Sequence, residues 1–333
     1  MSNQKKQWFL GIDLGGSKIL TAVVSPQGKI RSHDYRVTQA EKGAEVVIRE
    51  LLDSVGSAVK QAGMDIKEIN AIGIGMAGFS NPETGVVFSS PNLPGWHNVP
   101  LRDLIQRETG RKAFLINDAN AAALGELYFG AARKTRNFIY ITLSTGIGGG
   151  IVINGELYTG NIGTAGEIGH MTIEAHGPRC GCGNTGCWEA LASGSALARQ
   201  AVQHIKQGAQ TSILNYAQGD SEKVTAQFIQ MAAEHGDSLA QELITEASYY
   251  TGVGLANLIN IFNPELIVIG GGLTNIGDTF LKPAYKVARD RAYKGAYQAV
   301  RFTLAKLGPN SGVIGAAIFA FNEMKNRHQK RSP

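Results

Sequence analysis

The chain has 333 residues, of which 43% are hydrophobic and 18% charged, a balance that predicts a packed core and excludes intrinsic disorder. The formal net charge of +5 comes mostly from the two ends, so it gives no reason to expect a nucleic-acid partner. The N-terminus has no apolar stretch for a signal peptide, and the longest apolar run, 313–321, is too short to span a bilayer. We therefore expect a cytoplasmic protein without a membrane partner. The basic residues at the ends are Lys5, Lys6, Lys325, Arg327, Lys330 and Arg331.

Three segments combine a β-rich apolar run with glycines at its end: 8–16, 138–150 and 266–272. A glycine turn after a strand presents backbone N–H groups that bind phosphates or nucleosides. Strand-like runs at 19–24 and 151–153 follow the first two segments after short turns. This pattern predicts a hairpin that occurs twice along the chain, and hence a duplicated half-domain.

Helices are predicted between these strands. Apolar residues recur every fourth position from Val47 to Val59, which predicts a helix with one buried stripe. Residues 118–127 are rich in alanine and follow a candidate N-cap, and a periodic run at 243–262 ends at Asn263 before a proline. Because strands and helices alternate, the fold class is α/β.

We predict two domains with a boundary at Asn117. The smaller α/β domain comprises residues 1–116 and 313–333, and the larger one comprises residues 117–312. The apolar stretch 312–324 has a helical pattern and is expected to pack back on the smaller domain.

Gly73, Gly75 and Gly78 match the glycine fingerprint of dinucleotide-binding folds. That fingerprint requires a helix next, whereas residues 80–82 predict a turn. A dinucleotide site is therefore disfavoured here.

The cysteines Cys180, Cys182 and Cys187 are the only ones in the chain and lie close together among glycines. Their odd number in a chain expected to be cytoplasmic argues against disulfides. His170 stands upstream and completes a set of three thiolates and one imidazole, which predicts a closed, structural zinc site. Three reduced thiols without metal are the alternative, and His176 is a competing ligand.

Four acidic residues stand out beside these features. Glu167 and Glu189 flank the cysteine loop, where carboxylates can accept hydrogen bonds from the vicinal hydroxyls of a sugar; solvated surface charge is the alternative. Asp13 ends an apolar strand, where a charge is expensive unless it serves a cation or donor, which indicates a place near Mg²⁺ and phosphate. Asp118 lies between a strand and a helix, so it could be functional or a plain helix cap.

Five motifs in order resemble the ROK family of repressors, open-reading-frame proteins and sugar kinases, and within it the bacterial glucokinases. They are Asp-Leu-Gly-Gly-Ser-Lys at 13–18, Asn-Asp-Ala-Asn-Ala-Ala at 117–122, Ser-Thr-Gly-Ile-Gly-Gly at 144–149, Glu-x-Gly-His at 167–170 and Cys-x-Cys-Gly-x-x-Gly-Cys-x-Glu at 180–189. The resemblance extends over almost the whole chain, and the last two motifs are the most specific. One small departure is Ser17, where threonine is commoner, although both offer a hydroxyl.

The resemblance implies an actin-like ATPase fold, with two RNase-H-like domains around a central cleft, and ATP with Mg²⁺ as cofactor. The residues that it assigns to the cofactor are Asp13, Gly15, Gly16, Ser17, Lys18, Thr145, Gly146, Gly270, Gly271 and Gly272. It implies Asp118 as the catalytic base that takes the proton of the sugar 6-hydroxyl. The sugar-binding residues that it implies are Gly78, Asn92, Asn117, Asp118, Glu167, His170 and Glu189. His170 would also bind structural Zn²⁺ with the three cysteines, using its other ring nitrogen for the sugar.

The expected reaction is ATP-dependent phosphorylation of glucose to glucose 6-phosphate, by a homo-oligomer that is a dimer or a tetramer. A sibling kinase for fructose, mannose or an N-acetylhexosamine is the alternative, because the motif residues are common to these enzymes. A sugar-responsive DNA-binding repressor is disfavoured, since only 12 residues precede Asp13 and a helix-turn-helix module needs more.

Overall fold

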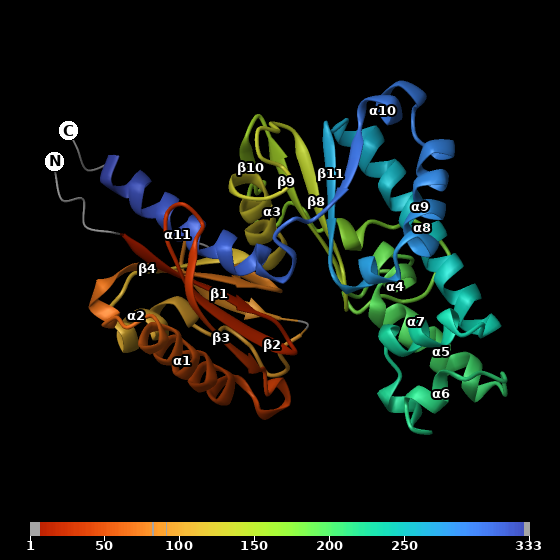
Figure 1. Ribbon diagram of the computed structural model, residues 1–333, viewed down its shortest axis with the longest axis horizontal. Helices are drawn as coiled ribbons and strands as arrows, with labels where there is room; N and C mark the ends of the chain where they lie inside the picture. The colour runs from red at the N-terminus through yellow and green to blue at the C-terminus, as the bar shows by residue number, and fades with distance from the viewer. Residues whose placement is uncertain (1–6, 82, 91, 330–333) are drawn as a thin grey trace. The chain divides into compact units, whose positions relative to one another are not determined.

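The protein is described here as a computed structural model that covers residues 7–81, 83–90 and 92–329 (Figure 1). Lys5, Lys6, Lys330 and Arg331 lie outside the described residues. By its internal contacts the chain forms two compact units, the first from residues 1–140, 150–166 and 305–333 and the second from residues 141–149 and 167–304. This division groups residues 117–140 with the first unit, whereas the sequence analysis assigns them to the larger domain. The domain boundaries given by the sequence analysis stay a prediction.

The first unit contains a five-stranded sheet with the order β3-β2-β1-β4-β7. Strand β1 is antiparallel to β2 and parallel to β4, which is parallel to β7. A separate hairpin pairs β5 with β6. The strands are β1 (Trp8–Leu14), β2 (Lys18–Val24), β3 (Ile30–Val37), β4 (Ile69–Met76), β5 (Phe79–Asn81), β6 (Val86–Ser89) and β7 (Ala113–Asn117). The predicted turn after Gly78 is thus wrong in part, because residues 79–81 form strand β5.

A second five-stranded sheet repeats this order as β10-β9-β8-β11-β12. Its strands are β8 (Phe138–Leu143), β9 (Ile147–Ile153), β10 (Glu156–Tyr158), β11 (Leu266–Gly270) and β12 (Arg301–Leu304). The repeated order confirms the predicted duplication. The glycines at 148–150 belong to β9 rather than to the turn. A Cβ on Gly150 would lie 2.5 Å from the Cβ of Ala123, so Gly150 allows close packing against a helix.

Helices cover both faces of the first sheet (Figure 1). They are α1 (Ala44–Gln61) and α2 (Leu101–Thr109) on one face, and α3 (Asp118–Tyr128) and α11 (Ser311–Gln329) on the other. Val47, Leu51, Val55 and Val59 are buried, which confirms the stripe predicted for α1. Because apolar side chains reach the sheet from both sides, each face has its own core.

Helix α11 packs with its backbone directly on the sheet, as predicted. A Cβ on Gly11 would lie 1.9 Å from the carbonyl oxygen of Val313, and one on Gly73 would lie 1.8 Å from that of Ala316. Gly11 and Gly73 are register partners on β1 and β4. The glycine at 73 therefore makes room for a helix, which is a packing role and not a dinucleotide fingerprint.

A buried carboxylate holds the start of α11 to the end of α3. Glu126 is 0% exposed. Its oxygens accept hydrogen bonds from the backbone N–H groups of Ala131 (2.6 Å), Lys306 (3.1 Å) and Leu307 (2.9 Å) and from the hydroxyl of Ser311 (2.8 Å). These donors satisfy the buried charge, so Glu126 fastens the segment through which the chain re-enters the first unit.

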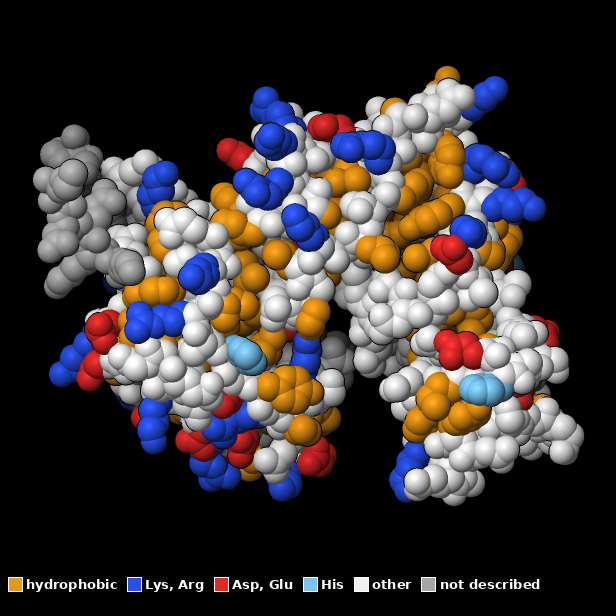
Figure 2. Space-filling view, in the orientation of Figure 1, with side chains coloured by type: hydrophobic (Ala, Val, Ile, Leu, Met, Phe, Trp, Pro, Cys, Tyr) orange, Lys and Arg blue, Asp and Glu red, His pale blue; other side chains and the backbone are white. Residues whose placement is uncertain are grey.

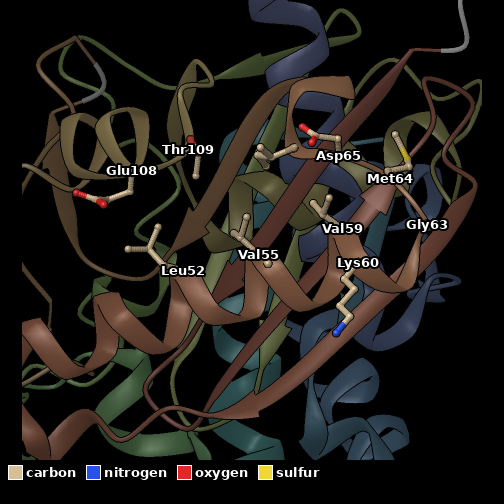
Figure 3. A pocket seen from close by; sticks show the side chains of 11 residues that line it. Leu52, Val55, Val59, Lys60, Gly63, Met64, Asp65, Glu108 and Thr109 are labelled. Atoms are coloured by element: carbon tan, nitrogen blue, oxygen red, sulfur yellow. The ribbon is translucent and has the colours of Figure 1, made fainter.

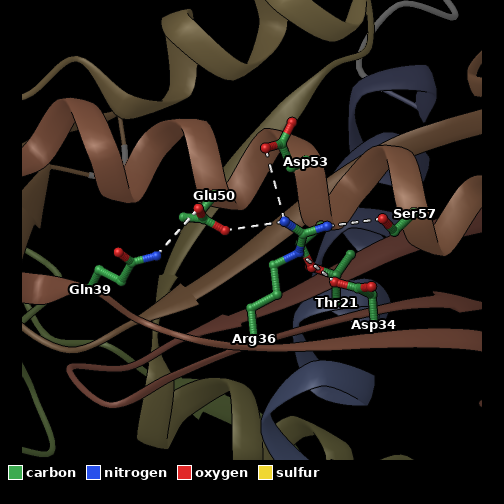
Figure 4. Close-up of polar contacts among 8 residues, drawn as sticks. Thr21, Asp34, Arg36, Gln39, Glu50, Asp53 and Ser57 are labelled. Carbon is green, nitrogen blue, oxygen red and sulfur yellow. Dashed lines mark hydrogen bonds and ion pairs between the residues drawn. The ribbon is translucent and has the colours of Figure 1, made fainter.

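On the opposite face, Arg36 ties β3 to α1 (Figure 4). Its guanidinium donates to Asp34 at 2.9 Å, to Glu50 at 3.1 Å and to the hydroxyl of Ser57 at 3.0 Å. Hydrogen bonds to Asp34 are the largest cause of a raised pKa for Arg36. Each such pair near the surface contributes at most about 1 kcal/mol, but the fork geometry orients the end of β3.

The second unit is largely helical around its strands (Figure 1). Its α-helices are α4 (Trp188–Ala192), α5 (Gly194–Lys206), α6 (Ile213–Tyr216), α7 (Ala226–Glu234), α8 (Ser238–Phe262), α9 (Asp278–Arg291) and α10 (Lys294–Ala299). Short 3₁₀ helices in the two units are η1 (Ala40–Lys42), η2 (Ile66–Glu68), η3 (Ile168–His170), η4 (Ser221–Lys223), η5 (Gly272–Ile276) and η6 (Gly308–Asn310). Helix α8 ends where the sequence predicts, with Asn263 as its C-cap. Asn263 has a left-handed conformation with φ +42°. Among the residues that the structure describes, no helix has the length and hydropathy of a membrane span.

Candidate functional site

The turn between β1 and β2 offers backbone N–H groups to a ligand. The N–H of Gly15 donates to the carbonyl of Lys18 at 2.9 Å and closes the turn. The N–H groups of Gly16 and Ser17 have no acceptor within residues 7–81, 83–90 and 92–329. Adjacent unpaired amides on a glycine turn form an anion-binding concavity, which is what the sequence predicts for these residues.

Asp13 and Lys18 stand on either side of this turn. The Lys18 Nζ lies 3.6 Å from the Asp13 carboxylate. Burial raises the pKa of Asp13, and the charge of Lys18 opposes that shift. A carboxylate held in such a place carries charge at a cost, which a cation beside it would offset.

The loop after β6 packs against the same turn. The carbonyl oxygen of Asn92 lies 2.6 Å from the position that a Cβ on Gly16 would occupy. Leu93 and Trp96 are each 1% exposed and anchor the loop in the core, whereas Asn92 is exposed. Gly78, with φ +116°, precedes β5 and leaves no room for a side chain beside the backbone of Ser89. Of this predicted sugar loop, Asn92 is the residue whose side chain is available to a ligand.

Asn117 and Asp118 both contact backbone N–H groups at the start of α3. The side-chain oxygen of Asn117 accepts hydrogen bonds from the N–H groups of Ala119 at 3.0 Å and Asn120 at 3.1 Å, so Asn117 is the N-cap of α3. Asp118 is the first residue of the helix, half-buried, and one carboxylate oxygen accepts from Ala119 at 2.9 Å. Asn117 therefore supplies the N-cap, and Asp118 accepts from the N–H of Ala119 that Asn117 also binds.

The turn between β8 and β9 in the second unit is also closed by a backbone hydrogen bond and held by donors from outside the turn. The N–H of Ser144 donates to the carbonyl of Gly146 at 2.9 Å. The carbonyls of Ser144 and Thr145 accept from the N–H groups of Gly194 at 2.8 Å and Ser195 at 3.1 Å. The N–H groups of Thr145 and Gly146 find no acceptor in the described part of the chain.

A pocket of about 610 Å³ lies beside this turn, within the second unit. Thr145 and Gly272 line it, whereas Gly146, Gly270 and Gly271 are outside its described lining. Polar side chains from α7 and η5 that sequence reasoning missed also line it: Thr225, Gln227, Gln230 and Asn275. No motif marks them, because they come from separate elements and have no common spacing.

Glu167, His170 and Glu189 lie near one another in the second unit. The His170 Nε2 is 3.9 Å from a Glu167 carboxylate oxygen. Burial raises the pKa of Glu167, and Glu189 adds to this, although the side chain is 51% exposed and solvent screens much of the effect. Glu189 accepts a hydrogen bond from the N–H of Ile147 at 2.8 Å, which attaches it to the start of β9. The structure therefore brings these three predicted residues together.

His170 also belongs to a cluster with the three cysteines. The ligand atoms of His170, Cys180, Cys182 and Cys187 all lie within 4.8 Å of one another. The Cys180 Sγ is 3.7 Å from the His170 Nδ1, and the Cys182 Sγ is 3.7 Å from the Cys187 Sγ. Sulfur atoms at tetrahedral corners about 2.3 Å from Zn²⁺ are about 3.8 Å apart, so the donor set and its spacing fit zinc.

The electrostatics of the cluster agree with a metal-binding role. Burial raises the pKa of Cys187 to about 12 and raises that of Cys180 as well. Such sulfur atoms become thiolates when a cation compensates the charge. His176, the competing ligand, lies outside the cluster of described residues. His170 directs Nδ1 to the cysteines and leaves Nε2 on the side of Glu167.

A second cavity of about 630 Å³ lies on the first unit beside α1 and the end of α2 (Figure 3). Its described lining includes Leu52, Val55, Met64 and Glu108 and none of the predicted site residues. It is therefore separate from the chemistry described above.

Comparison with known proteins agrees with the resemblance seen in the motifs. The ROK family model matches residues 9–323. The glucokinase of Thermotoga maritima is 38% identical over 312 residues, which cover 93% of this chain and 96% of that protein. The xylose repressor of Caldicellulosiruptor bescii is 34% identical over 316 residues, which cover 95% of this chain and 78% of the repressor.

Among solved structures, a ROK family glucokinase from Streptomyces griseus in complex with glucose and AMPPNP is similar at 35% identity with a TM-score of 0.83. The match covers 95% of this chain and 99% of that one. Together with the two sheets of like order, this similarity confirms the actin-like ATPase fold. The chain belongs to the ROK family.

Proposed function

We propose that this protein transfers the γ-phosphoryl group of ATP to the 6-hydroxyl of glucose. The observation that carries the proposal is the similarity over 95% of the chain to a glucokinase whose structure holds glucose and AMPPNP. Within this chain, each residue type that the reaction requires stands in a place suited to it.

The nucleotide is assigned to the two glycine turns and the pocket of the second unit. The N–H groups of Gly16, Ser17, Thr145 and Gly146, which have no acceptor among the described residues, are donors suited to phosphate oxygens. The pocket of about 610 Å³ has the volume for an adenosine, whose polar edges Gln227 or Gln230 could bind. Mg²⁺ beside Asp13 would supply neutralisation of phosphate charge.

Asp118 is assigned as the general base. It accepts the proton of the 6-hydroxyl as that oxygen forms a bond to the γ-phosphorus, while the bond from phosphorus to the bridging oxygen breaks and ADP leaves. Asn117 holds the helix start that carries Asp118. Gly78 and Asn92 from the first unit complete the residues proposed to contact the sugar there.

Glu167, His170 and Glu189 are assigned to the sugar hydroxyls. In this proposal Zn²⁺ binds His170 through Nδ1, on the side of Cys180, so the remaining ring nitrogen, Nε2, bears the proton. That nitrogen lies on the side of Glu167 and is available to donate to a hydroxyl oxygen. The metal would act by holding the imidazole and the loop, which is a structural role.

The experiment that tests the proposal is a coupled assay of ADP release over a panel of hexoses at saturating Mg-ATP. Glucose should have the highest kcat/KM, with mannose or glucosamine slower and N-acetylglucosamine poor. A site that binds a hydroxyl closely has little space for an acetamido group at carbon 2. When such a group enters, the polar groups of the site that would bind the hydroxyl lose their partner.

The other outcomes distinguish the alternatives. A tenfold preference for fructose, N-acetylglucosamine or N-acetylmannosamine would replace glucokinase by a sibling kinase of the same family. Absence of turnover with every hexose, together with sugar binding, would favour a regulator like the repressor relatives.

We also propose a cytoplasmic homo-oligomer, a dimer or a tetramer. The second unit exposes Tyr249, Ile261, Tyr293 and Leu304. Figure 2 shows apolar side chains gathered over the region of β11 and α9, whereas charged side chains surround α1 of the first unit. Exposed apolar surface of this kind supports self-association. Light scattering of the purified protein tests it, and a monomeric mass over the working concentration range would overturn it.

A further inference from the structure

Thr38 follows β3 and contacts the turn between β1 and β2 from outside. It is 4% exposed. Its hydroxyl donates to the carbonyl oxygen of Gly15 at 2.8 Å, and its backbone N–H donates to that of Ser17 at 3.1 Å. Both carbonyls that flank Gly16 are therefore held by one residue.

We propose that Thr38 is a positioning residue that aims the N–H of Gly16 at the nucleotide phosphates. This inference rests on the proposed kinase function. The carbonyl of Gly15 and the N–H of Gly16 belong to one planar, trans peptide unit, so they point in opposite directions. The hydrogen bond from the Thr38 hydroxyl to that carbonyl consequently orients the N–H of Gly16.

Such a restraint is needed because two consecutive glycines form the turn. Glycine reaches far more of φ/ψ space than other residues, so the peptide between Gly15 and Gly16 has little intrinsic preference for one orientation. If the donor is already oriented in the free protein, binding of the ligand does not have to include the loss of conformational entropy of the turn. Arg36, two residues before Thr38, binds Glu50 and Ser57 of α1 and so restrains the end of β3 next to Thr38 (Figure 4).

The second turn contains a related arrangement built from other donors. There the carbonyls of Ser144 and Thr145 accept from the N–H groups of Gly194 and Ser195, which orients the N–H groups of Thr145 and Gly146 by the same peptide geometry. In both turns the carbonyl of the first residue, Gly15 or Ser144, is bound from outside, and the amide that follows it, of Gly16 or Thr145, is left for a ligand. In the first turn, however, the bond that orients Gly16 comes from a side chain, so a substitution can remove it.

The test compares three variants of the full chain. Thr38→Val removes the hydroxyl and keeps the shape and the backbone N–H, and Thr38→Ser restores a hydroxyl. Thr21→Val is the matched control: Thr21 is 0% exposed in the same sheet and accepts a hydrogen bond from Ser54 at 2.9 Å, away from the turn. It removes a buried hydroxyl without touching the carbonyls of the turn.

We expect Thr38→Val to raise the KM for ATP about five- to tenfold, since one buried hydrogen bond is lost, and to leave the KM for glucose within twofold. Thr38→Ser should restore the KM for ATP to within about twofold of the parent. Thr21→Val should lower Tm by an amount similar to Thr38→Val and leave both KM values unchanged. If Thr38 has a purely structural role, Thr38→Val should lower Tm without raising the KM for ATP more than the KM for glucose.

Calorimetry with Mg-AMPPNP and no sugar gives a second readout that does not depend on the acceptor. If the parent binds AMPPNP but phosphorylates no hexose, the proposed function fails while Thr38 can still be tested. If Thr38→Val binds the nucleotide as the parent does, or if Thr21→Val weakens binding equally, the inference about Thr38 is wrong and the kinase proposal stands. Should Thr38→Val fail to fold, Thr38→Ser against Thr38→Ala in the same titration decides between the two results.

Discussion

At the scale of single residues, the structure identifies Asn117 as the N-cap of α3, and Asp118 is the residue that we propose as the base. Asn117 caps α3 through two backbone N–H groups, and Asp118 lies one position further on. We expect Asp118→Asn to reduce kcat by about 10²–10⁴-fold, because the proton acceptor is lost, and to change glucose affinity little. Steady-state kinetics with glucose calorimetry measures both. Tm should fall by less than in Asn117→Ala, which removes the cap at about 1 kcal/mol. Turnover near that of the parent would show that Asp118 is not the base.

Asp13 gives a prediction with a pH dependence. Burial raises its pKa above the ordinary value, so the folded state holds this proton more tightly than the unfolded state does. Ionised Asp13 therefore costs stability, and that cost appears as the pH rises above about 4, the ordinary pKa of an aspartate. Asp13→Asn should equal the parent in Tm near pH 3.5 and exceed it at pH 7, while its turnover falls. A Tm difference between the two proteins that is constant over this range, or that has the opposite sign at pH 7, would show that burial is not the main influence on the pKa of Asp13.

At the scale of elements, the approach of α11 to the first sheet is decided by glycines on the strands. A Cβ on Gly73 would lie 1.8 Å from the carbonyl oxygen of Ala316, which is backbone and cannot rotate away. Gly73→Ala should therefore displace α11 and destabilise the protein by about 1–3 kcal/mol or more, measured as a lower Tm.

Gly56 provides the matched control for this prediction. It lies in α1, is exposed, and a Cβ there would have nothing within 4 Å. Gly56→Ala should raise the stability by about 0.4–1 kcal/mol, since alanine favours the helix and restricts the unfolded chain. If Gly73→Ala leaves Tm unchanged, a methyl group fits between α11 and β4, and the explanation of this glycine by close packing is wrong.

At the scale of the whole molecule, the cysteine cluster and the pocket proposed to bind the nucleotide belong to one unit but are built from different elements. The pocket is lined from α5, α7 and η5, whereas the cluster holds Glu167 and Glu189 near His170. We expect about one zinc per chain, and Cys180→Ser or Cys187→Ser should lose both the metal and the stabilisation by glucose. Elemental analysis and the Tm shifts caused by glucose and by AMPPNP measure this.

The nucleotide is the internal control in that experiment. AMPPNP should still raise Tm in either cysteine variant, because none of the residues that line the pocket belongs to the cysteine loop 180–187. Protein purified without chelator that contains no zinc would contradict the metal assignment. Loss of both ligand shifts would instead mean that the whole unit unfolds without metal.

The sequence by itself determined the features whose cause is local. The stripe from Val47 to Val59 and the stop at Asn263 were predictable, because side-chain period and helix termination act within a few residues. The sequence narrowed the cap of α3 to Asn117 or Asp118, and the structure identifies Asn117. The metal cluster was predictable for the same reason, since three of its four ligands lie within one short loop, 180–187. The repeated strand and glycine pattern likewise predicted the repeated sheet order.

Only the tertiary structure decided which distant segments meet. Thr38 reaches a turn more than 20 positions away, and Glu126 binds N–H groups at 306 and 307. The lining of the pocket of about 610 Å³ includes residues of α5, α7 and η5, and Gly150 lies in a strand against α3. The physical reason is that backbone propensity and period depend on neighbours in the chain, whereas these contacts depend on how buried surfaces fit once the sheets and helices have packed.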